Sequence, residues 1–342
     1  MLNTNIRKKA DIREFLSQNA INMVLLALII IIAAWNPAFL SIRCLRDILV
    51  QSSTRAIIAL GAAFVLITGG TDLSSGRMVG FAAVLSSSML QTADYARRFY
   101  PNLPNLPLWL PILLAVLAGL AVGLLNGMIV SRLSVPPFIA TLGTMVMVYG
   151  INSIYFDLPP NNSQPIGGLR KDFTNLGTGF IGPNGLYSIP YILIIAVTMA
   201  LVAWVILNKT SLGKSIYAIG GNVNAATVSG INVAKTLLFV YAFAGALYGV
   251  AGVLEAARTG GATNNYGFMY ELDAIAACVV GGVSITGGVG TVPGVLSGVL
   301  IFTVINYGLT FVGLNPYWQQ IIKGLIIVSA VAFDIRKSFV KK

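Results

Sequence analysis

The chain has 342 residues and a formal net charge of +11, but only 10% of its residues are charged, against roughly 25% in soluble domains. With 56% hydrophobic residues, it is predicted to be an all-α, polytopic membrane protein. We assign the excess of Lys and Arg to cytoplasmic loops and anionic lipid, so nucleic acid is not an expected partner. Histidine is absent from the sequence and the two cysteines, Cys44 and Cys278, lack ligand-like spacing, so no metal site is expected.

The elements begin with a basic segment, residues 1–19, followed by an apolar block long enough to be a retained first helix. Apolar blocks between polar breaks predict ten membrane spans in all. The third is short, and the eighth crosses only if it begins within 267–271; otherwise it is partly re-entrant. The predicted spans are 20–40, 47–68, 76–92, 109–131, 137–156, 190–207, 236–257, 272–283, 291–312 and 318–334.

An even number of spans places both termini on one side of the membrane. The side that holds the termini also carries more Lys and Arg than the other side, and Arg77 is counted among them. Because Lys and Arg are enriched in cytoplasmic loops, both termini are predicted to be cytoplasmic. Residues 208–235 then form the longest cytoplasmic loop, and 93–108 and 157–189 form long outer loops. The outer loops are either partner-binding surfaces or solvated connections.

Two short strings echo each other: GGTDLSSG at 69–76 and GGVSITGG at 281–288. Each follows one apolar block and precedes another. Internal repeats are common in transporters, although small-residue helix turns explain a pattern of eight residues more simply.

The string at Gly213, Lys214 and Ser215 is similar to the end of a phosphate-binding loop. The glycine that such a loop needs five positions earlier is Asn208, and a spanning helix precedes it where a strand is required. We therefore expect no nucleotide bound by this chain.

The spacing of the acidic residues predicts no catalytic site. Glu255 and Arg258 stand three positions apart on a predicted helix and are expected to pair and neutralise each other. Glu271 and Asp273 are close in sequence but point to different faces of a helix.

The deep polar groups are mostly neutral amides, with Arg55 and Lys323 as charged exceptions. Such a lining suits a neutral, hydroxyl-rich solute, and it offers no internal energy source, so the power must come from a partner. For each amide taken alone, a hydrogen bond between helices is the favoured role. The candidate path residues are Asn126, Asn152, Asn264, Asn265, Asn306 and Gln319.

Long strings then resemble a known family. LGKSIYAIGGNVNAATVSGIN, ITGGTDLSSGRMVG, VPPFIATLGTMVMVYGINSIYFD, ATNNYGFMYELDAIAACVVGGVSITGGVGTV and IFTVINYGLTFVGLNPYWQQIIKG are similar to permeases of ABC sugar importers of the ribose, xylose and galactose type. The second half is most similar to the galactose and methyl-galactoside branch.

This resemblance implies one permease domain, 1–342, of about ten helices, similar to the large cobalamin-type importer permeases, in the bacterial inner membrane. The implied partners are a second copy of the chain, a cytoplasmic ATPase with two nucleotide-binding halves, a periplasmic sugar-binding protein and membrane lipid. ATP and Mg are expected on the ATPase and no cofactor on this chain, which is not an enzyme. A stand-alone secondary carrier or channel is the alternative.

The resemblance also assigns roles to residues. Loop 208–235 is implied to dock the ATPase, with glycines that permit sharp turns, a short helix at about 224–229 capped by Asn222, and small side chains that fit an ATPase groove. The residues implied are Gly213, Lys214, Ala218, Gly220, Gly221, Asn222, Ala225, Ala226, Ser229 and Gly230. On the outer loops, the paired cations are expected to hold acidic residues of the binding protein, or else to contact lipid headgroups. These cations are Arg97, Arg98, Arg170 and Lys171.

Overall fold

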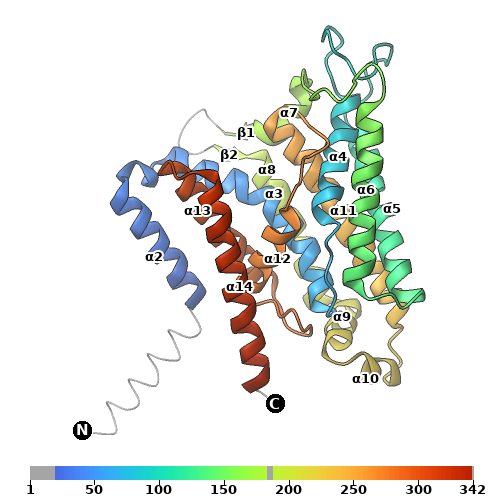
Figure 1. The fold of residues 1–342 in the computed structure, drawn as a ribbon, viewed down its shortest axis with the longest axis vertical. Coiled ribbons are helices and arrows are strands. Elements are labelled where there is room, and N and C mark those ends of the chain that lie inside the picture. Colours follow the sequence, from blue (N-terminus) through green and yellow to red (C-terminus); the bar gives the residue numbers. More distant parts are fainter. Residues whose placement is uncertain (1–19, 183–187, 341–342) are drawn as a thin grey trace.

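The computed structural model describes residues 20–182 and 188–340, and this part of the chain is almost entirely α-helical (Figure 1). The predicted segment 1–19, with its four cations, lies outside the described residues, as does part of the predicted outer loop 157–189. The elements are α2 (Ala20–Trp35), η1 (Pro37–Leu40), α3 (Ile42–Ile67), α4 (Ser75–Met89), α5 (Trp109–Arg132), α6 (Pro137–Asp157), α7 (Lys171–Thr178), β1 (Phe180–Ile181), β2 (Ile189–Pro190), α8 (Tyr191–Lys209), α9 (Ser211–Gly221), α10 (Val223–Val228), α11 (Val233–Thr259), α12 (Tyr270–Val280), α13 (Val292–Phe311) and α14 (Pro316–Val340).

Six of the described helices are long and apolar enough to cross a membrane: α3, α5, α6, α8, α11 and α13. This confirms the polytopic helical class. Every predicted span coincides with a helix, but α4 has 15 residues and α12 has 11. At 1.5 Å per residue, α12 is about 17 Å long and reaches only about halfway across the hydrocarbon core.

Polar caps fix where several helices begin. The side chains of Ser41, Thr210, Asn232 and Thr291 each accept a hydrogen bond from a backbone N–H in the first turn of the helix that follows. Helix α11 ends at Gly260, which has a φ of +76° and so stops the helix in the left-handed conformation.

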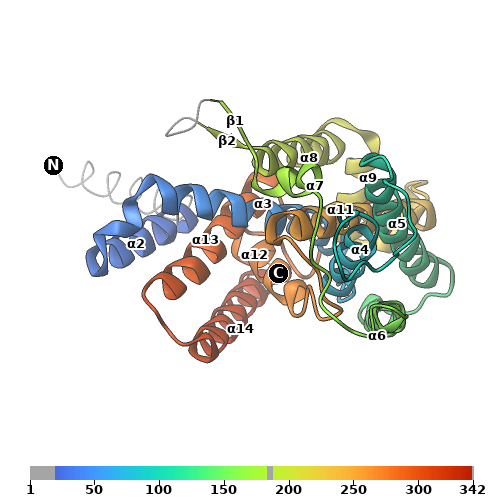
Figure 2. The same cartoon turned by 90° about the horizontal axis from the view of Figure 1, so that it is seen from above.

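Helix α11 is the centre of the bundle, and glycines bring α5 against it. A Cβ atom at Gly119 of α5 would lie 2.4 Å from the carbonyl oxygen of Gly245, and one at Gly245 would lie 2.3 Å from that of Gly119. The two backbones are therefore in direct contact, which is how membrane helices pack without a hydrophobic driving force between them. Seen from above, α2, α13 and α14 lie on one flank of this centre and α4, α5 and α6 on the other (Figure 2).

The two ends of the molecule differ. The connections after α4 and after α6 gather with α7 at one end, while α9 and α10 lie at the opposite end (Figure 1). The first turn of α2 and the last turn of α14 point to the α9–α10 end. The echoing strings meet there too, because the N–H of Gly288 donates to the carbonyl of Ile67, just before the first string, at 2.8 Å.

Candidate coupling and transport sites

The predicted loop 208–235 is mostly two short helices, α9 and α10, joined at Asn222. The Asn222 side chain accepts a hydrogen bond from the N–H of Ala225 at 3.0 Å. This confirms the predicted N-cap, and α10 begins one residue earlier than expected.

The prediction that the glycines of this segment form turns is wrong for three of the four. Gly213, Gly220 and Gly221 lie within α9, and only Gly230, with a φ of +81°, has a turn conformation. A Cβ atom at Gly213 would lie 2.2 Å from the carbonyl oxygen of Leu207, so this glycine permits close packing against the end of α8. A Cβ atom at Gly221 would meet nothing within 4 Å.

Gly220 sits in a junction of three backbones. A Cβ atom there would lie 1.8 Å from the carbonyl oxygen of Ile67, the last residue of α3, and 2.4 Å from the nitrogen of Gly288. One turn earlier, the Tyr217 hydroxyl donates to the carbonyl of Gly290 at 2.7 Å. Helix α9 is thereby held against both the end of α3 and the connection between α12 and α13.

The outward face of α10 is small and partly apolar. Val228 is 90% exposed and Val223 47% exposed, and Ala225 and Ser229 are exposed as well. Ala226 is only 3% exposed and is covered by this chain, so the expectation that its side chain enters a partner's groove is wrong. Of the remaining predicted docking residues, Lys214 is exposed and Ala218 is half-buried.

The connections that were predicted to face outward form an ordered cap, called the outer cap below. The buried Gln91 side chain donates to the carbonyl of Gly167 at 2.8 Å and accepts from the N–H of Phe99 at 2.6 Å. The backbone adds a hydrogen bond from Thr92 to Gly168 and a β-bridge between Ile166 and Ala262. One amide side chain therefore ties two connections together, which argues against simple solvated loops.

The four predicted outer cations fall into two groups. Arg98 donates to the carbonyls of Pro101 and Leu103, and Arg170 pairs with Asp172 and donates to the carbonyl of Leu106. These two arginines shape the cap itself. Arg97 and Lys171 are exposed, and neither forms an ion pair with any residue that the structure describes.

The six candidate path amides do not form a single lining. Asn126 is fully buried, donating to the Ser74 hydroxyl at 2.9 Å and accepting from Thr144 at 2.7 Å, so it joins α4, α5 and α6. Ser74 also donates to the buried Asp72 at 2.6 Å. Asp72 was not singled out from the sequence, because its burial depends on helices distant in the chain.

Three of the other amides lie close together, where α6 contacts the connection between α11 and α12. Asn152 donates to the carbonyl of Asn264 at 3.3 Å, and Asn264 donates to Ser153 at 3.4 Å. Asn265 is exposed beside them.

The last two candidate amides lie elsewhere in the bundle. Asn306 is on α13, and its side-chain amide has no hydrogen-bond partner among the described residues. Gln319 is on α14 and donates to the carbonyl of Leu314 at 2.9 Å. Both are therefore separate from the other four amides.

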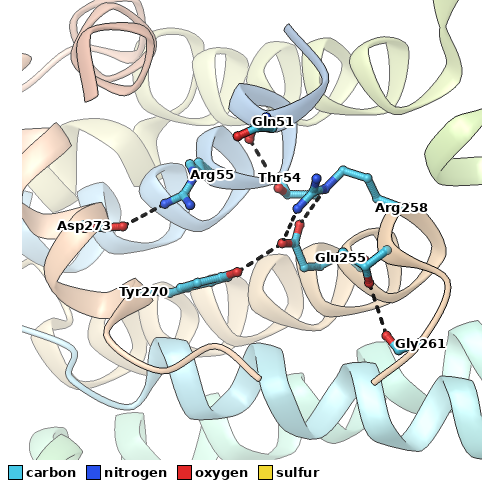
Figure 3. Close-up of polar contacts among 9 residues, drawn as sticks. Gln51, Thr54, Arg55, Glu255, Arg258, Gly261, Tyr270 and Asp273 are labelled. Carbon is cyan, nitrogen blue, oxygen red and sulfur yellow. Dashed lines mark hydrogen bonds and ion pairs between the residues drawn. The ribbon is translucent and has the colours of Figure 1, made fainter. Parts of the chain in front are cut away.

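Buried charges form a network between α3, α11 and α12 (Figure 3). Glu255, 3% exposed, accepts from Arg258 at 2.6 Å, which confirms the predicted pair, and also from the Tyr270 hydroxyl at 3.1 Å. Asp273 pairs with Arg55 at 2.7 Å.

Asp273 also binds a second cation. The Lys323 ammonium of α14 lies 3.1 Å from its carboxylate, so one carboxylate joins α3, α12 and α14. As predicted, Glu271 points elsewhere, and a Cβ atom at Gly76 of α4 would lie 2.2 Å from its Oε2. Glu255 and Asp273 are thus each paired with a cation, which is how buried ions are tolerated at membrane depth, whereas the buried Oε2 of Glu271 has no hydrogen-bond partner among the described residues.

Arg77 is not on the inner surface, where it was predicted. Its guanidinium carbon lies 4.3 Å from the centre of the Tyr149 ring, and Tyr149 is in the middle of α6. The prediction failed because residues 68–74 are not helical and α4 begins partway across the bundle.

Comparison with known proteins identifies the family. Residues 44–331 match the family described as branched-chain amino acid transport system / permease component. The chain belongs to this permease family. It is 54% identical to the galactose/methyl galactoside import permease protein MglC of Haemophilus influenzae, over 96% of this chain and 97% of that protein. It is 52% identical to the protein of the same name in Escherichia coli, over 98% of both.

A more distant relative is the ribose import permease protein RbsC of Haemophilus influenzae, 38% identical over 95% of both chains. No solved structure matches the chain. As a permease whose described residues include six apolar helices of spanning length, the protein is a multi-pass transport subunit of the bacterial inner membrane.

Proposed function

We propose that this permease is the membrane-channel subunit of an ATP-driven importer for galactose, methyl galactoside or a related monosaccharide. The observation that carries the proposal is the near full-length identity of 52–54% to galactose/methyl galactoside import permeases, against 38% to a ribose import permease. A periplasmic binding protein delivers the sugar, and the permease passes it inward by alternating access.

The energy comes from a cytoplasmic ATPase with two nucleotide-binding halves, which holds ATP and Mg. We place its docking surface on α10, because Val223 and Val228 are apolar and exposed, and no described helix covers them. Movement of α10 reaches the membrane helices through α9, whose Gly220 touches the last carbonyl of α3.

We further propose ten crossings with both termini in the cytoplasm. Residues 208–235 then form the ATPase-coupling segment and 93–108 and 157–189 the periplasmic face. Support comes from the arrangement of the ends, because the outer cap lies opposite α9 and α10, and α2 begins and α14 ends on the α9–α10 side (Figure 1). Two copies of the permease form the channel, and lipid covers the remaining apolar faces, such as that of α6 with Ile151 and Ile154 exposed.

Transport by purified components tests this function. The permease is placed in vesicles with its partner ATPase and binding protein, and uptake of labelled galactose is measured. We expect uptake that requires ATP, stops with vanadate and survives collapse of the proton gradient. A secondary carrier or channel would give the reverse result, and competition by ribose but not galactose would contradict the proposed substrate.

The topology and stoichiometry have separate tests. Single cysteines in α10 should react with a membrane-impermeant reagent only from the cytoplasmic side, and cysteines near Arg97 only from outside. The mass of the purified complex should correspond to two permeases, and one permease per complex would contradict the homodimer.

A further inference from the structure

Arg77 has an unusual set of neighbours. Its guanidinium lies 4.3 Å from the centre of the Tyr149 ring and 5.2 Å from that of Phe268, and it donates to the Asn265 side-chain oxygen at 3.2 Å. No carboxylate of the described residues lies within ion-pair distance of it. This arginine is therefore held by rings and an amide, while the carboxylate of Glu271, which faces the neighbouring Gly76, acts on it only through longer-range electrostatics.

The group lies at bilayer depth. Helix α6 has 21 residues, about 31 Å in length, which matches the hydrocarbon core. Tyr149 follows Pro137, the first residue of α6, by twelve positions and precedes Asp157, the last, by eight, so the ring lies about 18 Å from one end and about 12 Å from the other. The guanidinium stacked on it is therefore well inside the membrane.

The group is also at the surface of the chain. Phe268 is 54% exposed, Tyr149 is 39% exposed, and Asn265 is exposed. The connection from α11 to α12 that carries Asn265 and Phe268 lies at the edge of the bundle, between α14 and α6 (Figure 2). An arginine facing lipid at this depth costs about 2.5–3.5 kcal/mol or more. The cost argues against lipid as the cover of this face and favours water.

We propose that Arg77, Asn265, Tyr149 and Phe268 form a sugar-contact site on the water-filled path. The aromatic rings offer flat apolar surfaces for the C–H face of a pyranose, and the guanidinium and amide supply hydrogen bonds for its hydroxyls. A neutral sugar needs no opposite charge, in keeping with an arginine that no carboxylate pairs. The inference rests on the proposed sugar-import function and names the point where the sugar touches this chain.

The first test is accessibility of the site. An Asn265→Cys variant in vesicles with the full importer should react with a membrane-impermeant thiol reagent, and saturating galactose should slow the reaction several-fold. The wild type gives the background, because Cys44 and Cys278 are buried. Ile151→Cys, exposed two positions from Tyr149 on the opposite, lipid-facing side of α6, is the control for depth and should stay unreactive with and without galactose. An unreactive Asn265→Cys, or one that galactose does not protect, overturns the site.

The second test separates sugar contact from folding. Arg77→Gln should lower galactose transported per ATP hydrolysed by about tenfold or more, the effect of losing one charge-assisted contact of 1.5–3 kcal/mol. Binding-protein-stimulated ATPase and the amount in the membrane should stay at wild-type values. Arg132→Gln, at the end of α5, is the control. Equal losses of uptake and ATPase overturn the site. Failure of the wild type to take up galactose overturns the proposed function instead.

Discussion

The two ends of the molecule are held in different ways. At the α9–α10 end, Gly220 places the backbone of α9 directly on the last carbonyl of α3. At the outer end, the buried side chain of Gln91 bridges two connections. The first contact is backbone against backbone, and the second passes through a side chain.

The difference bears on what each end can transmit. A contact between backbones has almost no compliance, since close-packed atoms cannot approach further, so a shift of α9 must move α3 or separate from it. A side-chain bridge can bend about its torsions and keep its hydrogen bonds. The inner end is suited to passing on movement, and the outer end to holding shape while a partner docks.

The largest effect is expected from Gly220→Val. Its side chain would overlap the carbonyl oxygen of Ile67, because the Cβ alone lies 1.8 Å from it. Overpacking of this kind costs about 1–3 kcal/mol or more, and α9 must leave the junction. We expect uptake and binding-protein-stimulated ATPase to fall to background while basal ATPase is kept.

Gly221→Val is the matched control for that change. It adds the same side chain one residue later, where a Cβ meets nothing within 4 Å of this chain. If both variants transport normally, the junction does not carry movement. If only Gly221→Val fails, the ATPase contacts α9 and the junction is not the sensitive point.

The next largest effect is expected from Gln91→Ala at the outer cap. It leaves the N–H of Phe99 and the carbonyl of Gly167 without their partner, at about 1–3 kcal/mol for a buried group. We expect faster proteolysis between residues 93 and 108 and weaker binding of the binding protein, with ATPase docking unchanged. An unchanged proteolysis rate would mean that the backbone contacts alone hold the cap.

A smaller effect is expected from Tyr217→Phe at the inner junction. It removes the hydrogen bond to Gly290 and keeps the ring, a net loss of about 0.5–1.5 kcal/mol. Burial raises the pKa of Tyr217 above its ordinary value of 10.0, so the bond's contribution is complete below that pH and declines only as pH rises through the raised pKa. Thermal unfolding of the two forms should therefore differ by a constant amount from pH 6 to 9, and a difference that disappears within this range contradicts the assignment.

Features that depend on nearby residues were predictable from the sequence. The membrane helices follow from runs of apolar residues, the cap at Asn222 from its own side chain, and the Glu255–Arg258 pair from one helical turn. Each needs no knowledge of the rest of the fold.

Features that depend on distant segments were not predictable. Arg55 and Asp273 are 218 positions apart, and no periodicity pairs them. Gly220 permits close packing because α3 ends against it, whereas Gly230, the same residue type, forms a turn. Arg77 was misplaced because the depth at which α4 begins is set by its neighbours and not by its own sequence.

The smallest effect concerns the surface of the outer cap. Reversing Arg97 and Lys171 to Glu should weaken association of the binding protein by reducing electrostatic steering, mainly through a slower association rate at low salt. The difference from wild type should shrink as ionic strength rises to about 0.15 M, where the screening length is about 8 Å.

Reversing Arg98 and Arg170 should instead weaken binding at every ionic strength, because those side chains hold the carbonyls of Leu103 and Leu106 and so shape the cap. The same salt dependence for both pairs would mean that all four cations act only through long-range charge. A lack of any effect from Arg97 and Lys171 would assign these two to lipid headgroups.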